Sequence, residues 1–401
     1  MSSVCMDYRV LSFQSHVSYG FVGNKCAMPI FFLNKVNADF INSVNLCAPS
    51  NYPSHVGTRL TGEECDLYFK GLKENDLLNH RFFITGYIGQ PSVLSSIGKY
   101  LLNCREEAKQ FFYVCDPVMG DNNSFYVSQD LVEIYKSSIL RHADLCLPNI
   151  FEFECLSGVP IHGKSDVKRG FQELHAKYNI PIIILKSVKL DKNGKRVGRS
   201  YFDPPTPSPS PRPAGADKML LRPSHSPSAR AMMTDTMTLF LSIAYENDEL
   251  CSSSEEKSSS DSSSSCDDPK KAEVSNEVYS VTFPYFDYDF GGTGDTFAAL
   301  ITAHLIKGLK KIEGEKAKEA DEGKSEEEEE KQKEKSAKRM IMPKELVKRA
   351  CEIALTSLHK IIALTYHEDS IELNLLESSD TIKSEEILFH LADETFDEVD
   401  E

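Results

Sequence analysis

The sequence predicts one α/β domain of three layers, in which helices cover both faces of a mostly parallel central sheet. Two observations support this fold class. Up to about Val188, near-continuous apolar runs of strand length alternate with segments of helical period, which is typical of a parallel sheet buried on both faces. Hydrophobic residues make up 40% of the 401 residues, which is enough for one large core.

The expected strands and helices follow from this alternation. Five apolar runs in the first half have the length and composition of buried strands, at 10–13, 82–85, 111–115, 145–147 and 182–185. The segments between them that repeat apolar residues at helical spacing are 92–102, 128–140 and 168–177. Later in the chain we expect strands at 237–243 and 278–286, helices at 296–307 and 344–363, and a strand at 371–375.

Three low-complexity inserts interrupt this pattern, at about 200–235, 247–276 and 310–341, and an acidic tail begins near residue 385. The first insert contains a proline-serine tract that cannot join the centre of a sheet. Residues 252–268 of the second are nearly all serine and acid, so we expect them to be disordered. The third is rich in Glu and Lys, and we expect disorder or partial helix. The inserts therefore interrupt a single domain spanning residues 1–401.

The composition argues against several classes of protein. A net charge of −16 argues against a nucleic-acid partner, because binding that polyanion needs a basic surface. No apolar run is long enough to span a membrane, and the first residues lack a secretory signal, so we expect a cytoplasmic protein. The eleven cysteines lie scattered in apolar segments, as expected for reduced core thiols.

The most informative motif is the glycine turn Gly292-Thr293-Gly294-Asp295, which precedes an apolar helix. Glycines let the backbone approach a ligand, and the helix N-terminus adds N–H donors that favour an anion such as phosphate. A carboxylate at Asp295 would repel that anion, so it is better placed to take a proton from a hydroxyl. The alternative is an ordinary strand-to-helix turn, which the tetrad alone would favour.

Three other polar clusters follow predicted strands, where the ligands of parallel sheets collect. Residues 14–24 are small and polar and could hold a neutral substrate, although an ordinary loop with a structural His16 fits equally well. Asp116 and Asp121 flank a turn and could handle Mg²⁺, or they could only stabilise that turn. Asn149 and Glu152 would share one helix face, and the alternative is a capped helix start.

In order along the chain, these segments resemble pyridoxal kinases of the ribokinase-like superfamily. The segments that carry the resemblance are 10–17, 20–24, 42–44, 85–87, 114–121, 148–152 and 292–295. The matching parts run from about Val10 to Leu185 and from Val278 to about Leu376. The resemblance implies ATP-dependent phosphorylation of the 5′-hydroxymethyl group of pyridoxal, pyridoxine or pyridoxamine. It also implies Mg²⁺ or another divalent cation, a monovalent cation (K⁺ or Na⁺) and a homodimer.

The resemblance also implies a role for each matching residue. Asp295 would be the general base, and Gly292, Thr293 and Gly294 would form the anion hole. The residues around the substrate would be Ser15, Val22, Val44, Ser50 and Tyr87, together with Asp295. Those serving ATP would be Asp116, Asn149, Glu152, Lys186, Ser187, Thr293 and Gly294. The metal ligands would be Asp116, Asp121 and Glu152.

The chain departs from the family pattern at several positions. Leu147 and Leu185-Lys186 stand where the family has hydroxyl residues that help to bind the monovalent cation or the nucleotide. Our hypothesis is that Lys186 supplies the charge of that cation. Pro49 stands in place of a histidine before Ser50.

Two other functions stay open on the sequence. One is hydroxymethylpyrimidine kinase, a sister enzyme with the same chemistry. The segments 14–16 and 85–87 favour pyridoxal over the pyrimidine. The other is a scaffold that has kept the fold and lost catalysis, with its inserts used for protein partners. The intact Asp295 and Asp116 argue against a scaffold.

Overall fold

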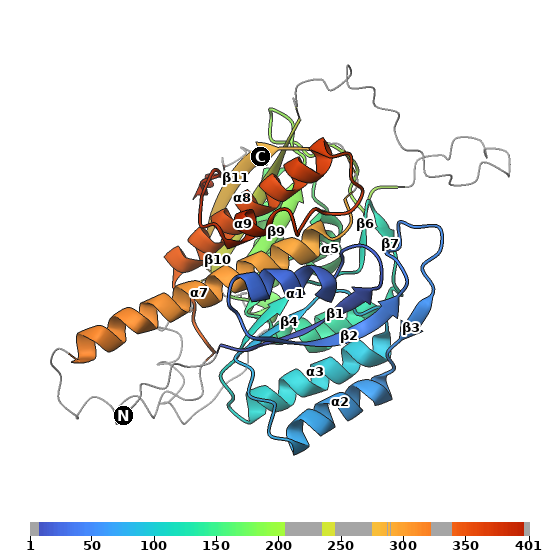
Figure 1. Ribbon diagram of the computed structural model, residues 1–401. Helices are drawn as coiled ribbons and strands as arrows, with labels where there is room; N and C mark the ends of the chain where they lie inside the picture. The colour runs from blue at the N-terminus through green and yellow to red at the C-terminus, as the bar shows by residue number, and fades with distance from the viewer. Residues whose placement is uncertain are drawn as a thin grey trace, which may run out of the picture.

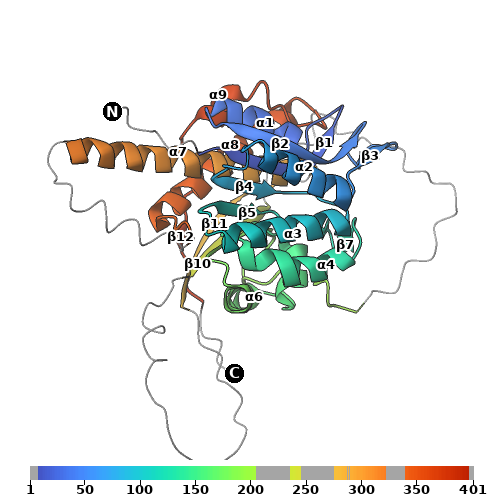
Figure 2. The same cartoon turned by 90° about the horizontal axis from the view of Figure 1, so that it is seen from below.

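The computed structural model describes residues 8–204, 235–244, 275–286, 288, 290–321 and 339–396. The described residues form a three-layer α/β fold around a ten-stranded sheet, which confirms the predicted fold class (Figures 1 and 2). The order of the strands is β12-β11-β10-β9-β8-β5-β4-β1-β2-β3. The pairings from β2 through β9 are parallel, and the pairings at both ends of the sheet are antiparallel.

The strands of the sheet are β1 Val10–Val17, β2 Ala38–Leu46, β3 Gly57–Arg59, β4 Phe82–Thr85, β5 Phe112–Cys115, β8 Leu145–Cys146, β9 Ile182–Val188, β10 Thr236–Ala244, β11 Asn276–Pro284 and β12 Ala392–Asp393. A separate hairpin consists of β6 Gly120–Asp121 and β7 Ser124–Phe125. The α-helices are α1 Asn24–Leu33, α2 Gly62–Glu74, α3 Pro91–Glu106, α4 Asp130–Ile134, α5 Ile150–Ser157, α6 Lys164–Tyr178, α7 Thr293–Asp321, α8 Lys344–His367 and α9 Ser379–Lys383.

Two apolar cores lie on opposite faces of the sheet. Neighbouring strand residues alternate between them: Val10 belongs to one core and Leu11 to the other, as do Phe82 and Phe83. Helices α1, α7, α8 and α9 cover the first face, and α2 to α6 cover the second. Figure 1 shows α2 and α3 on the side of the sheet opposite to α1 and α7. Burial on both faces explains why these strands read as continuous apolar runs.

Several expected elements differ in the structure. The strand expected at 371–375 was wrong: these residues form turns, and β12 pairs with β11 instead. The alternation that suggested a strand reflects the burial of Leu373 and Leu375 against the first core, without any partner strand in the described residues. The helix expected at 128–140 begins as α4 and continues as a π-helical turn over Tyr135–Ile139.

The inserts are only partly within the described residues. Helix α7 continues to Asp321, so the first part of the third insert is helical, in line with the expected partial helix. Residues 205–234, 245–274 and 322–338 lie outside the described residues, and so do the expectations about them. The ends of the second insert are fixed, because Ala244 of β10 pairs with Asn276 of β11.

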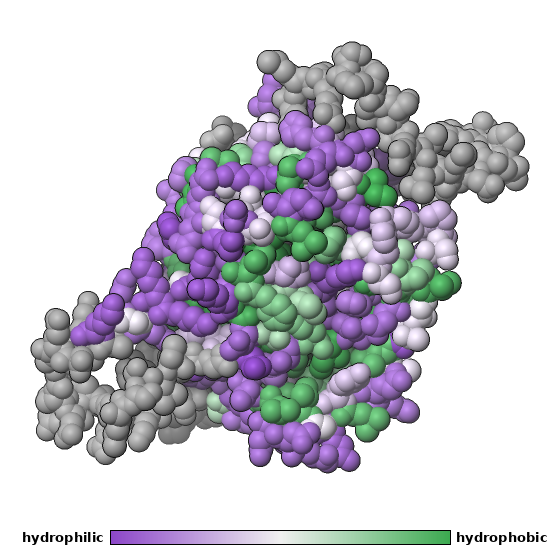
Figure 3. All heavy atoms as spheres, viewed as in Figure 1, coloured by the Kyte–Doolittle hydropathy of each residue, from purple (hydrophilic) through white to green (hydrophobic). Residues whose placement is uncertain are grey.

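Figure 3 shows that the face seen in Figure 1 is mostly hydrophilic, with apolar residues in small groups between polar ones. Within the described ranges, none of the helices is both long and apolar enough to cross a membrane.

Candidate active site

The glycine turn begins α7 and lies against the loop that follows β1. Gly292 has a φ of +79°, and a Cβ atom added to it would overlap the carbonyl oxygen of Phe21. Both its conformation and this close approach therefore require glycine. The amide of Thr296 donates to Gly292 O at 2.9 Å, which closes the first turn of the helix. The free N–H groups ahead of this turn make it suited to an anion, as the motif predicts.

Asp295 lies in the first turn of α7, and a hydrogen bond from the loop after β1 holds its side chain. The backbone N–H of Gly23 donates to Asp295 Oδ2 at 2.7 Å. The pKa of Asp295 is raised to about 6, mainly by burial and also by the charge of Asp116, while the Gly23 hydrogen bond and Lys186 act to lower it. A carboxylate with this pKa is ionised at neutral pH and basic enough to accept a proton from a hydroxyl group.

Asp116 and Lys186 form a buried ion pair beside the glycine turn. Lys186 Nζ lies 2.8 Å from Asp116 Oδ1, and the Asp116 side chain is 1% exposed. Asp116 Oδ2 has no hydrogen-bond partner among the described residues. A Cβ atom added to Gly294 would lie 3.3 Å from Lys186 Nζ and 3.7 Å from Asp116 Oδ2, so the pair adjoins the turn directly.

Asn149 and Glu152 form a capping box at the start of α5. Asn149 Oδ1 accepts the N–H of Glu152, and Glu152 Oε2 accepts the N–H of Asn149. Glu152 Oε1 also accepts the N–H of Met119, which ties α5 to the segment after β5. Burial raises the pKa of Glu152 to about 8, with Lys186 lowering it and Asp116 raising it. The pair therefore caps a helix and also contributes a carboxylate to the cluster around Lys186.

The expected metal ligands are only partly brought together. Asp121 is exposed on the β6–β7 hairpin, and its side chain accepts the N–H of Asn122. Over the described ranges, no group of three or more acidic, histidine or cysteine side chains is arranged to hold a metal ion. A divalent cation at Asp116 and Glu152 would need further oxygen ligands, which nucleotide phosphates supply in many Mg²⁺ sites.

Two of the substrate residues expected from the sequence, Ser15 and Val22, lie near Gly23 and the glycine turn. Strand β1 runs four residues past its expected end and therefore includes Ser15. Ser15 lies at the bulge between Gln14 and His16. A Cβ atom added to Gly23 would overlap Ser15, so the two residues are in close contact. Val22 lies 3.8 Å from the Cβ position of Gly291, at the edge of the glycine turn.

For the other expected substrate residues, the structure gives a position in the fold but no contact with the glycine turn in the described part of the chain. Val44 is fully buried in β2, and Ser50 is exposed in the loop that follows this strand. In the same loop, Asn51 Nδ2 lies 3.9 Å from the Cβ position of Gly291. The carbonyl of Tyr87 accepts the Ser43 hydroxyl at 2.5 Å. Two others, Ser187 beside Lys186 and Thr293 at the start of α7, stay predictions for ATP contacts.

Two residues of the site were not predicted from the sequence. Tyr126 follows the β6–β7 hairpin and is 54% exposed. Partial desolvation, and then the nearby carboxylates of Glu152, Asp121, Asp116 and Asp295, raise the pKa of its hydroxyl. Glu372 comes from the C-terminal segment and accepts the N–H of Phe21 at 2.8 Å and the hydroxyl of Tyr52 at 2.9 Å. The two hydrogen bonds of Glu372 join segments that are distant in the chain.

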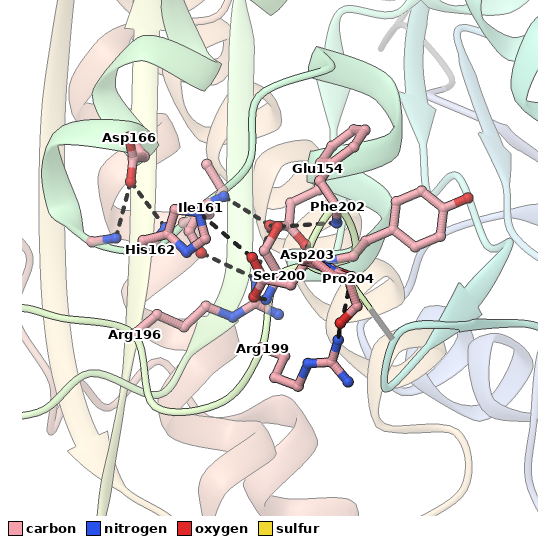
Figure 4. A network of polar contacts seen from close by, with 12 residues as sticks. Glu154, Ile161, His162, Asp166, Arg196, Arg199, Ser200, Phe202, Asp203 and Pro204 are labelled. Atoms are coloured by element: carbon pink, nitrogen blue, oxygen red, sulfur yellow. Dashed lines mark hydrogen bonds and ion pairs between the residues drawn. The ribbon is translucent and has the colours of Figure 1, made fainter. Parts of the chain in front are cut away.

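A polar network behind α5 holds the segment that follows β9 (Figure 4). The buried Glu154 carboxylate accepts Ile161 N–H, the Ser200 hydroxyl and Tyr201 N–H, and it forms an ion pair with Arg196. This network holds residues 196–204 against the helix. The ring of Tyr201 then packs at 5.8 Å from the ring of Phe125 in the β6–β7 hairpin.

Comparison with known proteins agrees with this geometry. Residues 80–204 match the family model described as phosphomethylpyrimidine kinase. Pyridoxal kinase of Dictyostelium discoideum is 37% identical over 189 residues, covering 47% of this chain and 62% of that protein. Pyridoxal kinase of Arabidopsis thaliana is 40% identical over 177 residues, covering 44% and 57%. The matched stretch thus spans about 60% of the length of these relatives.

The solved structures match over almost the whole length. Pyridoxal kinase from Leishmania donovani in complex with ADP and pyridoxamine has a TM-score of 0.64 at 23% identity, covering 97% of this chain and 100% of that one. The Plasmodium falciparum protein PdxK with AMP-PNP and PL has a TM-score of 0.63 at 20% identity, covering 96% and 99%. The chain therefore has the ribokinase-like fold of the pyridoxal kinases and is related to them in sequence.

Proposed function

We propose that this chain is a pyridoxal kinase, which transfers the terminal phosphoryl group of ATP to the 5′-hydroxymethyl group of pyridoxal, pyridoxine or pyridoxamine. The observation that carries the proposal is the meeting of three groups at one point. These are the anion-binding glycine turn, the Asp295 carboxylate held by Gly23, and the buried Lys186–Asp116 pair. The names of its relatives and of the matching structures support the same reaction.

The groups divide the work of phosphoryl transfer between them. The N–H groups of the turn from Gly292 to Gly294 would stabilise the charge on the transferring phosphoryl group. Asp295 would take the proton from the substrate hydroxyl as the bond to phosphorus forms. Ser15 and Val22, which adjoin Gly23 and the turn, would position the ring that carries this hydroxyl.

Asp116 and Glu152 are the residues that would hold a divalent cation together with the nucleotide. The partnerless Oδ2 of Asp116 fits such a role, because a buried carboxylate oxygen normally has a cationic or N–H partner. Asp121, on the exposed hairpin, would reach the cation only through water. When bound, the cation would neutralise charge on the phosphates. A homodimer and a cytoplasmic location stay predictions from the resemblance and the composition.

Hydroxymethylpyrimidine kinase is the second candidate, because the family model that matches residues 80–204 carries the name of a related activity. The test is a comparison of kcat/KM for pyridoxal and for hydroxymethylpyrimidine with ATP and Mg²⁺. We expect pyridoxal to be preferred at least ~10-fold, since a hydroxyl or ring nitrogen without its partner costs about that much. A preference for the pyrimidine would contradict the proposal, and turnover of neither would favour a scaffold.

A further inference from the structure

Lys186 occupies the centre of the charged cluster. It lies in β9, with Leu185 fully buried before it, and its side chain is 16% exposed. Its ammonium group contacts Asp116 on one side, and on the other it lies 3.3 Å from the Cβ position of Gly294. A positive charge is therefore built into the protein between the carboxylate cluster and the turn that would bind the phosphoryl group.

Three carboxylates of the site share this one cation. Asp116, Glu152 and Asp295 each interact electrostatically with Lys186. Lys186 contacts Asp116 directly, and its charge lowers the pKa of Glu152 and of Asp295. Without Lys186, the cluster would hold several negative charges at low exposure next to a site for a polyanion, which is unfavourable unless a cation is bound there.

A free monovalent cation does not fit the same place. K⁺ and Na⁺ bind to oxygen ligands, and the resemblance implies hydroxyl side chains at the positions of Leu147 and Leu185. Both leucines are fully buried and offer no side-chain oxygen. Asp116 Oδ1 already accepts a hydrogen bond from the Lys186 ammonium group, and the carbonyl of Pro148 accepts one from the backbone N–H of Lys186 at 3.1 Å. The residues at this position therefore suit an ammonium group, and they lack the side-chain hydroxyls that would help to hold a monovalent ion.

We propose that the Lys186 ammonium group takes the place of the monovalent cation, so that nucleotide binding and turnover in this chain require neither K⁺ nor Na⁺. A lysine ammonium is a compact point charge, comparable in charge to the ion that it replaces. Because the charge is part of the chain, it is present at any ionic composition. The inference about turnover rests on the proposed kinase function, whereas the inference about nucleotide binding can be tested without it.

The first test compares salts at constant ionic strength. ADP affinity, measured by calorimetry, and pyridoxal turnover are determined for the unmodified protein in KCl, NaCl and tetramethylammonium chloride. We expect both quantities to agree within about twofold in the three salts, because the required charge is already in place. An increase of tenfold or more in ADP affinity with K⁺ or Na⁺ would overturn the inference. Absent turnover with unchanged ADP binding in all three salts would instead count against the proposed reaction.

The second test exchanges the charge for a hydroxyl. Lys186→Thr removes the ammonium group, so we expect ADP affinity in tetramethylammonium chloride to fall at least ~10-fold, and K⁺ to restore part of it. Lys186→Arg keeps a positive charge and should bind ADP without any response to K⁺. The matched control is Lys189→Thr, three residues further on, where the side chain is paired with Asp235 away from the cluster.

Each outcome with these variants supports or contradicts the role of Lys186. ADP affinity of Lys186→Thr equal to that of the unmodified protein in tetramethylammonium chloride would overturn the role of Lys186. If Lys186→Thr does not fold, the salt comparison of the unmodified protein decides alone. A fall in ADP affinity in the Lys189→Thr control as large as in Lys186→Thr would also contradict the inference, because the effect would then be unspecific.

Discussion

At the scale of single residues, the chemistry of the site depends on how Asp295 is held. The carboxylate has one strong partner, the N–H of Gly23, and lies close to Asp116 and Lys186. Opposing effects therefore set its basicity: burial and Asp116 favour the protonated form, and Gly23 and Lys186 favour the ionised form.

This balance predicts how the rate depends on pH. The pKa of Asp295 is raised to about 6, and only the ionised carboxylate can accept a proton. We therefore expect the ionisation of Asp295 to make kcat/KM for pyridoxal rise with pH and to give this rise a midpoint near pH 6. Below pH 6, kcat/KM should fall about tenfold for each pH unit. A half-maximal point at pH 4 would show that burial does not control this group.

The hydrogen bond from Gly23 can be tested separately. Gly23 has a φ of +53°, and a Cβ atom there would overlap Ser15, so Gly23→Ala must displace the N–H that holds Asp295. We expect kcat/KM to fall at least ~10-fold and its half-maximal pH to move upward, because the lost hydrogen bond stabilises the ionised form. Gly71→Ala, in helix α2 with open space around it, is the control and should leave both unchanged. An unchanged pH profile in Gly23→Ala would contradict the role of this hydrogen bond.

The sequence predicted part of the site at this scale. The glycine turn and the acids after the strands could be recognised, because their residue types are tied to local backbone geometry. Tyr126 and Glu372 could not, since their roles depend on contacts between distant segments: Glu372 bonds Phe21 across 351 positions. The pairing of Lys186 with Asp116 could not be predicted from the sequence either. The sequence showed only that a lysine stands where the resembled family has a hydroxyl residue.

At the scale of secondary-structure elements, Glu372 joins the loop after β1 to the loop after β2. It accepts a hydrogen bond from Phe21, in the loop that carries Gly23, and one from Tyr52, in the loop after β2. Tyr52 also packs edge-on against Tyr19 at 5.7 Å. The C-terminal segment thereby holds two loops together that no strand or helix connects directly.

This arrangement predicts a defect in substrate binding when the carboxylate is changed. Glu372→Gln keeps the shape but cannot accept both hydrogen bonds without rearrangement, and a hydrogen bond to a charged group contributes about 1.5–3 kcal/mol. We expect the KM for pyridoxal to rise about 10-fold while ADP affinity stays unchanged. Glu377→Gln, an exposed glutamate five residues further on, is the matched control. Equal losses of ADP affinity and pyridoxal binding would indicate a general structural role instead.

The elements were predictable where burial alone determines their sequence. The strands β4, β5 and β9 are buried on both faces and read as apolar runs. Strand β2 was missed because its residues Ala38–Leu46 include asparagines and aspartate and are only partly buried. The false strand at 371–375 has the opposite cause: its leucines alternate because they pack into a core, and hydrophobic alternation alone cannot distinguish such packing from a sheet.

At the scale of the whole molecule, the sheet gathers residues from distant parts of the chain at one edge. Asp116 follows β5, Asn149 follows β8 and Lys186 lies near the end of β9, while Ser15 lies near the end of β1. These strands are parallel, so their carboxyl ends meet on the same side, where helix α7 begins with the glycine turn. The fold thus brings together the predicted substrate and nucleotide residues.

The second insert is predicted to be dispensable for this arrangement. It connects β10 and β11, whose ends pair directly at Ala244 and Asn276, so a much shorter connection can close the hairpin. We expect deletion of residues 252–268 to change kcat/KM less than twofold and to leave the melting temperature nearly unchanged. A large loss of activity with an unchanged melting temperature would assign the insert a role in function.

The measurement that most directly tests the central claim is steady-state turnover of pyridoxal with ATP and Mg²⁺ by the unmodified protein and by Asp295→Asn, alongside calorimetric ADP binding. Asp66→Asn, an exposed aspartate in helix α2, serves as the control. We predict turnover by the unmodified protein, a loss of at least ~10²-fold in kcat for Asp295→Asn, and ADP affinity within a few-fold in all three proteins. Turnover by Asp295→Asn within a few-fold of the unmodified protein would contradict the assignment of Asp295 as the base.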